Sequence, residues 1–276
     1  MNDLERLLYL PERARAVIVT RAIVALHALW IVLSRFCLPD LFFWPREFWS
    51  GVAHETVLRY GWLTEIPERA LFVALLILLP IAIWSRAASI LSAVLLYHFA
   101  PLEDAIIGWP GPYLRGLTVD VVALAILALS PPSRSMPSGN FRWPILLVRF
   151  AVAAQYTFST VAKLRATGID WFSADNISNV ARIYQMIGVA PHAELVIQHR
   201  PLAFIIGAGW FVLSIGIAVA VVSRRAAAVV TPLMALAHMA AAFLFGIVWL
   251  AAPLLLVFIE FGQRTTPNSS IQRASA

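Results

Sequence analysis

The chain has 276 residues, of which 61% are hydrophobic and only 13% are charged. Soluble domains have roughly 45–50% apolar and about 25% charged residues, so this composition excludes a water-soluble globule and a disordered chain. The net charge of +6 comes almost entirely from arginine, which we expect at the cytoplasmic ends of membrane helices, and we expect no nucleic-acid partner. Cys37 is the only cysteine, which excludes intramolecular disulfides and cysteine-based metal clusters.

The apolar stretches predict an all-α, polytopic transmembrane bundle without a soluble domain. Residues 1–15 are predicted to be an amphipathic segment on the membrane surface, because charges flank their short apolar run. Residues 16–262 form the predicted transmembrane domain, and 263–276 are a polar tail. Candidate spans lie at residues 16–36, 70–84, 87–100, 117–129, 144–164 and 202–222.

The last apolar stretch, residues 226–261, is too long for one span. As a single helix it would measure about 54 Å, against a membrane core of about 30 Å. It must therefore fold back, and Phe245-Gly246 is the expected break. This gives about eight spans, several of them short. The connections richest in arginine then share a face with both termini, which predicts cytoplasmic termini in a plasma (inner) membrane. The long connections 37–69, 101–116 and 165–201 are expected as loops on the other side.

One predicted span carries a polar stripe. At 100° per residue, six polar side chains of residues 144–164 fall within about 140° of arc: Arg149, Gln155, Tyr156, Ser159, Thr160 and Lys163. Because a cation facing lipid costs roughly 2.5–3.5 kcal/mol, the stripe must face the bundle or a wet cavity. Two interpretations stay open. The stripe holds helices together while Lys163 reaches the interface, or it lines a pocket in which a neutral lysine acts as a general base.

Three histidines lie in predicted spans and are further candidates. His98 ends the third span, His238 lies within the final apolar stretch, and His27 lies within the first. A lone intramembrane histidine is more often a hydrogen-bonded core residue than a ligand. The sequence has no HxxxH or HExxH pattern, so we expect no metal site.

Several motifs together resemble a known membrane family. The order of Lys163-Leu164 and Trp171 resembles the K-L-x(n)-W signature of vitamin K-dependent gamma-carboxylase-like proteins, whose bacterial relatives carry the horizontally transferred transmembrane (HTTM) domain. The segment from His238 to Ile247 is similar to the H…FGI helix of that domain, and residues 26–30 fit its N-terminal part. The resemblance covers about residues 15–262.

The resemblance implies a reduced, vitamin K-like quinone as the ligand. In the carboxylase a lysine deprotonates the reduced vitamin, and that lysine corresponds to Lys163. A histidine at the end of an earlier helix supports the oxygenated intermediate, and His98 is the nearest match by order. The expected site is a pocket in the lipid bilayer between spans three, five and seven, lined by the polar stripe and His238.

Two other functions remain as alternatives. The chain is either a non-catalytic membrane scaffold or an accessory subunit of a redox or export system, with protein partners that the sequence does not identify. A small-solute transporter is the other possibility, although the spans show no inverted repeat.

Overall fold

The computed structural model describes residues 14–36, 68–107, 117–130, 142–247 and 251–259. Throughout these residues the chain is helical or in short turns, and no strand occurs among them, which confirms the all-α prediction. The α-helices are α2 (Ala14–Phe36), α4 (Glu68–Ala82), α5 (Arg86–Ile107), α6 (Leu117–Leu129), α7 (Arg142–Thr167), α8 (Ala174–Met186), α9 (Ala193–Gln198), α10 (Arg200–Val222) and α11 (Arg224–Phe245), and the 3-10 helices are η4 (Gly168–Phe172) and η5 (Ala252–Phe258).

Four helices are long and apolar enough to cross a membrane, so this is an integral membrane protein. They cover Arg15–Ser34, Arg142–Phe172, Arg200–Val222 and Arg224–Phe245. Three shorter apolar helices cover Ala70–Ala82, Arg86–Ala100 and Leu117–Leu129. The expected count of eight spans is not confirmed, because the segment after α11 forms η5, a 3-10 helix of seven residues.

The predicted break in the last apolar stretch is confirmed. Gly246 ends α11 in the left-handed conformation, with φ of 67°, and its N–H donates to the Ala242 carbonyl. Glycine adopts this conformation without steric cost, which is why it commonly ends helices.

Two expected loops contain helix. The stretch 165–201 holds η4, α8 and α9, and α5 continues beyond Pro101 to Ile107. Helix α8 is amphipathic, because its buried and exposed residues recur at helical spacing. Ser173 caps its N-terminus by accepting a hydrogen bond from the Asn176 N–H. Residues 1–13 of the predicted surface segment and the polar tail 263–276 lie outside the described residues.

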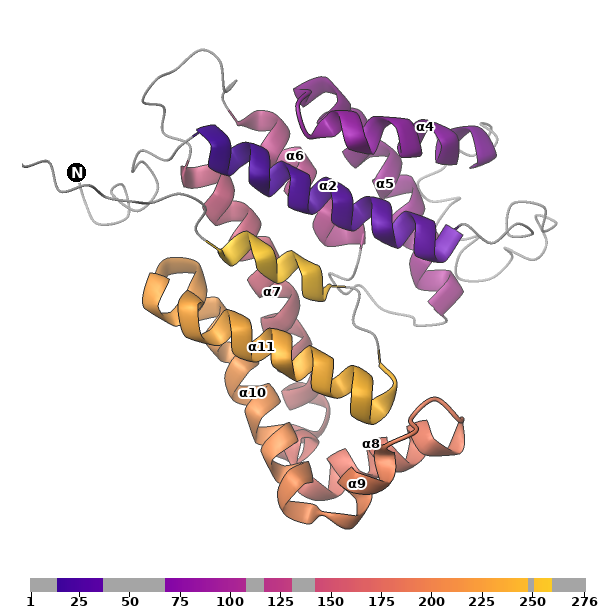
Figure 1. The fold of residues 1–276 in the computed structure, drawn as a ribbon, viewed down its shortest axis with the longest axis vertical. Coiled ribbons are helices and arrows are strands. Elements are labelled where there is room, and N and C mark those ends of the chain that lie inside the picture. Colours follow the sequence, from indigo (N-terminus) through magenta and orange to yellow (C-terminus); the bar gives the residue numbers. More distant parts are fainter. Residues whose placement is uncertain (1–13, 37–67, 108–116, 131–141, 248–250, 260–276) are drawn as a thin grey trace, which may run out of the picture.

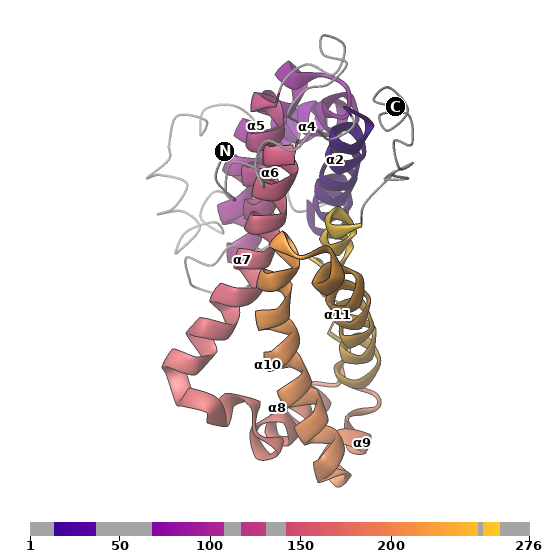
Figure 2. The same ribbon diagram turned by 90° about the vertical axis from the view of Figure 1, so that its left-hand side faces the viewer.

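The helices are arranged in two rows. Figure 1 shows α4, α2, η5 and α11 stacked in one row, with neighbours in contact. Figure 2 shows α5, α6, α7 and α10 in the second row, again with each helix packed on the next. The short helix η5 therefore takes the place between α2 and α11 that a full span would otherwise occupy.

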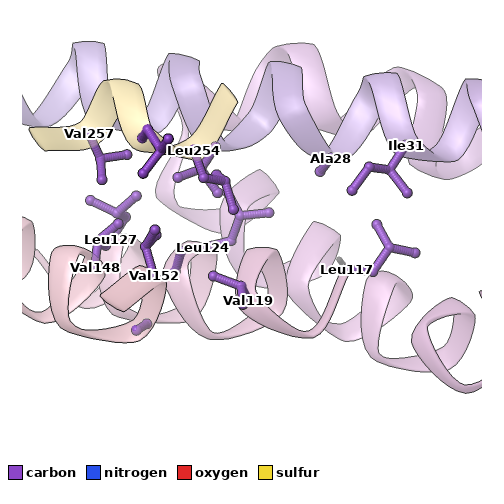
Figure 3. Close-up of a cluster of buried hydrophobic side chains, with 14 of the residues drawn as sticks. Ala28, Ile31, Leu117, Val119, Leu124, Leu127, Val148, Val152, Leu254 and Val257 are labelled. Carbon is purple, nitrogen blue, oxygen red and sulfur yellow. The ribbon is translucent and has the colours of Figure 1, made fainter. Parts of the chain in front are cut away.

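The main core lies between the two rows. Figure 3 shows Leu254 and Val257 of η5 above Leu127, Val148 and Val152 of α6 and α7. All five side chains are at most 2% exposed. Backbone that departs from a regular α-helix is tolerated at membrane depth where it is buried in protein or lines a water-filled cavity, and this packing buries η5 in protein.

The short helix α6 has its C-terminal carbonyls covered by arginines. Arg21 Nη2 donates to the Leu127 carbonyl at 2.6 Å, and Arg86 Nε donates to the Ala128 carbonyl at 2.7 Å. At 13 residues α6 is about 20 Å long, less than the membrane core. Its last carbonyls would then lie where water is scarce, so two long cationic side chains supply the hydrogen bonds that a longer helix would make itself.

Candidate functional site

The polar stripe of α7 faces the protein interior, as its periodicity predicts. Tyr156 is 5% exposed and Thr160 is 1% exposed, whereas Phe150 and Phe158, on the opposite side, are more than half exposed. Gln155, Ser159 and Lys163 are half-buried. The stripe is therefore covered by neighbouring helices along most of its length, and its two ends meet different partners.

The first end of the stripe belongs to the packing of η5. Arg149 Nε donates to the Val257 carbonyl at 2.8 Å, and the guanidinium lies 5.9 Å from the centroid of the Phe258 ring. Arg149 is fourteen positions before Lys163, or about 21 Å along a helix. This arginine satisfies a buried carbonyl and lies too far away to share a ligand pocket with the lysine.

The middle of the stripe contains a buried tyrosine–histidine hydrogen bond. Tyr156 Oη and His238 Nε2, on α7 and α11, are 2.9 Å apart. The His238 ring also lies edge-on to Trp210 of α10, with centroids 5.3 Å apart. Three helices thus meet at His238, and both it and Tyr156 are at most 5% exposed.

The far end of the stripe places Lys163 between two indole rings. Its Nζ lies 5.9 Å from the centroid of Trp171 on η4 and 5.6 Å from that of Trp210 on α10. A cation over an aromatic face at this range gains about 0.5–1 kcal/mol, and about 2 kcal/mol when desolvated. Trp210 contacts both Lys163 and His238, so the five residues Tyr156, Lys163, Trp171, Trp210 and His238 form one cluster, here called the Lys163 site.

Two glycines allow the chain to build this cluster. Gly168 has φ of 67°, which lets the backbone turn from α7 into η4 so that Trp171 comes back toward Lys163. Gly207 lies against the backbone of η4: a Cβ there would be 2.9 Å from the Phe172 carbonyl carbon and closer still to its oxygen. The close approach of η4 to α10 therefore depends on the missing side chain at Gly207.

Four buried polar atoms beside the Lys163 site have no hydrogen-bond partner among the described residues. They are Gln155 Oε1, Thr160 Oγ1, Ser214 Oγ and Thr231 Oγ1. Residues three, four or seven apart share a helix face. Thr160 and Ser214 each lie one turn beyond a site residue, Tyr156 and Trp210, and Thr231 lies two turns before His238. An unsatisfied buried polar group costs about 1–3 kcal/mol, so these four atoms lower the stability of the seam between α7, α10 and α11.

The structure does not bring His98 to Lys163. His98 is on α5, which packs on α4 and α6, and its ring lies edge-on to Phe99 with centroids 5.4 Å apart. In both views α5 lies at the opposite end of its row from η4 and the start of α10 (Figures 1 and 2). The histidine that lies near Lys163 is His238, because both contact Trp210.

A second buried pair was missed by sequence reasoning. His27 Nδ1 of α2 lies 2.9 Å from both carboxylate oxygens of Asp120 on α6, and both side chains are fully buried. The two residues are 93 positions apart. The available signal was an aspartate and a histidine, each within an apolar stretch, since such residues in membrane spans pair with one another.

The described residues form no cluster of metal-ligating side chains. No group of three or more His, Cys, Asp or Glu side chains there is arranged to hold an ion.

The comparisons with known proteins give no relative. No family model, no curated protein and no solved structure matches the chain.

Proposed function

We propose that this protein binds a reduced quinone-like lipid in the seam between α7, α10 and α11, with its ring beside the Lys163 site. The observation that carries the proposal is Lys163 Nζ held 5.6 and 5.9 Å from two indole rings, one of which also contacts the Tyr156–His238 pair. A quinone has an apolar body that suits aromatic walls and two oxygens that suit the unsatisfied polar groups of the seam.

The chemistry we propose is removal of a proton from a quinol hydroxyl. The proton leaves the hydroxyl for a base, and the negative charge that remains on the ring oxygen is stabilised by a nearby cation. The sequence suggests Lys163 as the base. Two indole faces attract an ammonium, which instead favours Lys163 as the cation. The Tyr156–His238 hydrogen bond then supplies the base: Tyr156 Oη takes the quinol proton while its own proton passes to His238 Nε2.

We further propose that the protein lies in the plasma (inner) membrane with both termini cytoplasmic. Positive residues at the starts of α7 and α11 support this orientation, because cytoplasmic ends are rich in arginine. The chain has Arg142 at the first of these ends and Arg224 and Arg225 at the second.

The test uses the full-length protein in nanodiscs with reduced 2-methyl-1,4-naphthoquinone. Binding is measured by quenching of tryptophan fluorescence, with Trp171→Phe and Trp210→Phe as the variants that remove the two rings beside Lys163. Turnover is measured as oxygen consumption with the quinol as electron donor. We expect Lys163→Ala to lower turnover by about 100-fold or more if the site is catalytic. Arg165→Ala is the matched control, because Arg165 is an exposed cation on the same helix.

Lys163→Arg separates the two roles of the lysine. Arginine keeps the positive charge but does not give up its proton. Retained turnover identifies Lys163 as the cation, and loss equal to that of Lys163→Ala identifies it as the base. If quinol neither binds nor turns over in the wild-type protein, the proposal is wrong, and the non-catalytic scaffold becomes the better interpretation.

A further inference from the structure

A groove at the end of the molecule joins the starts of α8 and α10. It is an open surface groove with a volume of about 440 Å³, lined by Ser173, Ala174, Asp175, Arg200, Pro201 and Phe204. Figure 2 shows these two helix starts together at the end of the α7–α10 pair, away from α5 and α6. The groove is distinct from the Lys163 site, whose residues are absent from its lining.

The groove holds one positive and one negative charge side by side. Arg200 Nη2 lies 3.0 Å from Asp175 Oδ2, and the two side chains are 75% and 72% exposed. An exposed ion pair of this kind contributes little stability, about 0–1 kcal/mol. Breaking this ion pair therefore costs little free energy, and each side chain can instead bind an oppositely charged group of a ligand.

An apolar track leads from the groove along α10. Phe204 lines the groove and is 59% exposed. On a helical wheel the other exposed apolar residues of α10 fall within about 100° of it, and they are Ile205, Val212, Ile215, Val219 and Val222. These side chains are between 44% and 65% exposed on the most apolar of the four long helices, so we infer that this side faces the acyl chains of the bilayer.

We propose that the groove binds the headgroup of a zwitterionic phospholipid of the phosphatidylethanolamine type. The guanidinium of Arg200 is matched to the lipid phosphate, since this planar group can donate hydrogen bonds to two phosphate oxygens at once. The carboxylate of Asp175 is matched to the lipid ammonium. Phe204 and the apolar track of α10 receive the acyl chains. A free headgroup would have the same charges but would make no use of the track.

The experiment is native mass spectrometry of the full-length protein in detergent with added lipid. Phosphatidylethanolamine is compared with phosphatidylglycerol, which has the phosphate but no ammonium, and with soluble glycerophosphoethanolamine, which has the headgroup but no chains. We expect phosphatidylethanolamine to be retained best. Arg200→Gln and Asp175→Asn should each lower its retention by about threefold, as expected for one exposed charge pair.

Arg182→Gln is the matched control. Arg182 is an exposed arginine of α8 that donates to Asn179 and does not line the groove, so its replacement should leave retention unchanged. The proposal is overturned if phosphatidylglycerol is retained equally well, if the soluble headgroup binds as strongly as the lipid, or if the groove variants retain as much lipid as the control. Lys163→Ala should leave lipid retention unchanged, which keeps this result independent of the proposed quinol chemistry.

Discussion

Replacing Gly207 by alanine should move η4 away from α10 and open the Lys163 site. The new Cβ would be 2.9 Å from the Phe172 carbonyl carbon, whereas ordinary contacts of a Cβ begin at 3.4 Å. The obstacle is backbone and cannot rotate away, so one segment must shift by about 1 Å, and overpacking of this kind costs about 1–3 kcal/mol. Because Trp171 is on η4, the shift also takes one indole away from Lys163.

The assay is thermal unfolding of the purified protein, with Gly209→Ala as the matched control. No atom lies within 4 Å of a Cβ at Gly209, and alanine is favoured over glycine within a helix by roughly 0.5–1 kcal/mol. We expect Gly207→Ala to lower Tm by roughly 3–10 °C and Gly209→Ala to leave it equal or higher. Equal Tm values for the two variants would refute the argument that close packing at Gly207 positions η4.

Three further predictions concern the other polar contacts. Asp120→Ala should destabilise the protein by about 3–5 kcal/mol, because it leaves His27 buried without its carboxylate, and replacing both residues by leucine should restore much of that loss; denaturant titration measures both. A double-mutant cycle of Tyr156→Phe and His238→Ala should give a coupling free energy of about 0.6–1.7 kcal/mol by thermal unfolding, and zero coupling would show that the two side chains do not bond. Glu194 of α9 accepts hydrogen bonds from two glutamine side chains, which lower its pKa. Their contribution should be complete above the ordinary carboxyl pKa and fade as the pH falls through the lowered value, and a ¹³C titration of Glu194 that gives an ordinary or raised pKa would contradict this.

The amphipathic pattern of α7 was readable from the sequence, but its partners were not. A period of 3.6 residues places Tyr156 and Thr160 on one face, and the cost of exposing polar groups to lipid turns that face inward. Nothing in the pattern says which helix covers it. Trp210 lies in a span whose only polar residue between Pro201 and Val222 is Ser214, so its contact with Lys163 and His238 became apparent only from the packed helices.

The sequence alone was enough to determine the all-α fold, the inward face of α7 and the break at Gly246, because each follows from the length of an apolar stretch, its periodicity or the backbone freedom of one glycine. Tertiary packing decided that His238 rather than His98 lies near Lys163, that His27 meets Asp120, and that residues 252–258 form the short helix η5. Lipid is as apolar as a helix surface, so burial of apolar area does not select helix neighbours. Close-fitting contacts such as Gly207 against η4 and hydrogen bonds such as that from Arg149 to Val257 make the selection, and both depend on residues far apart in the chain.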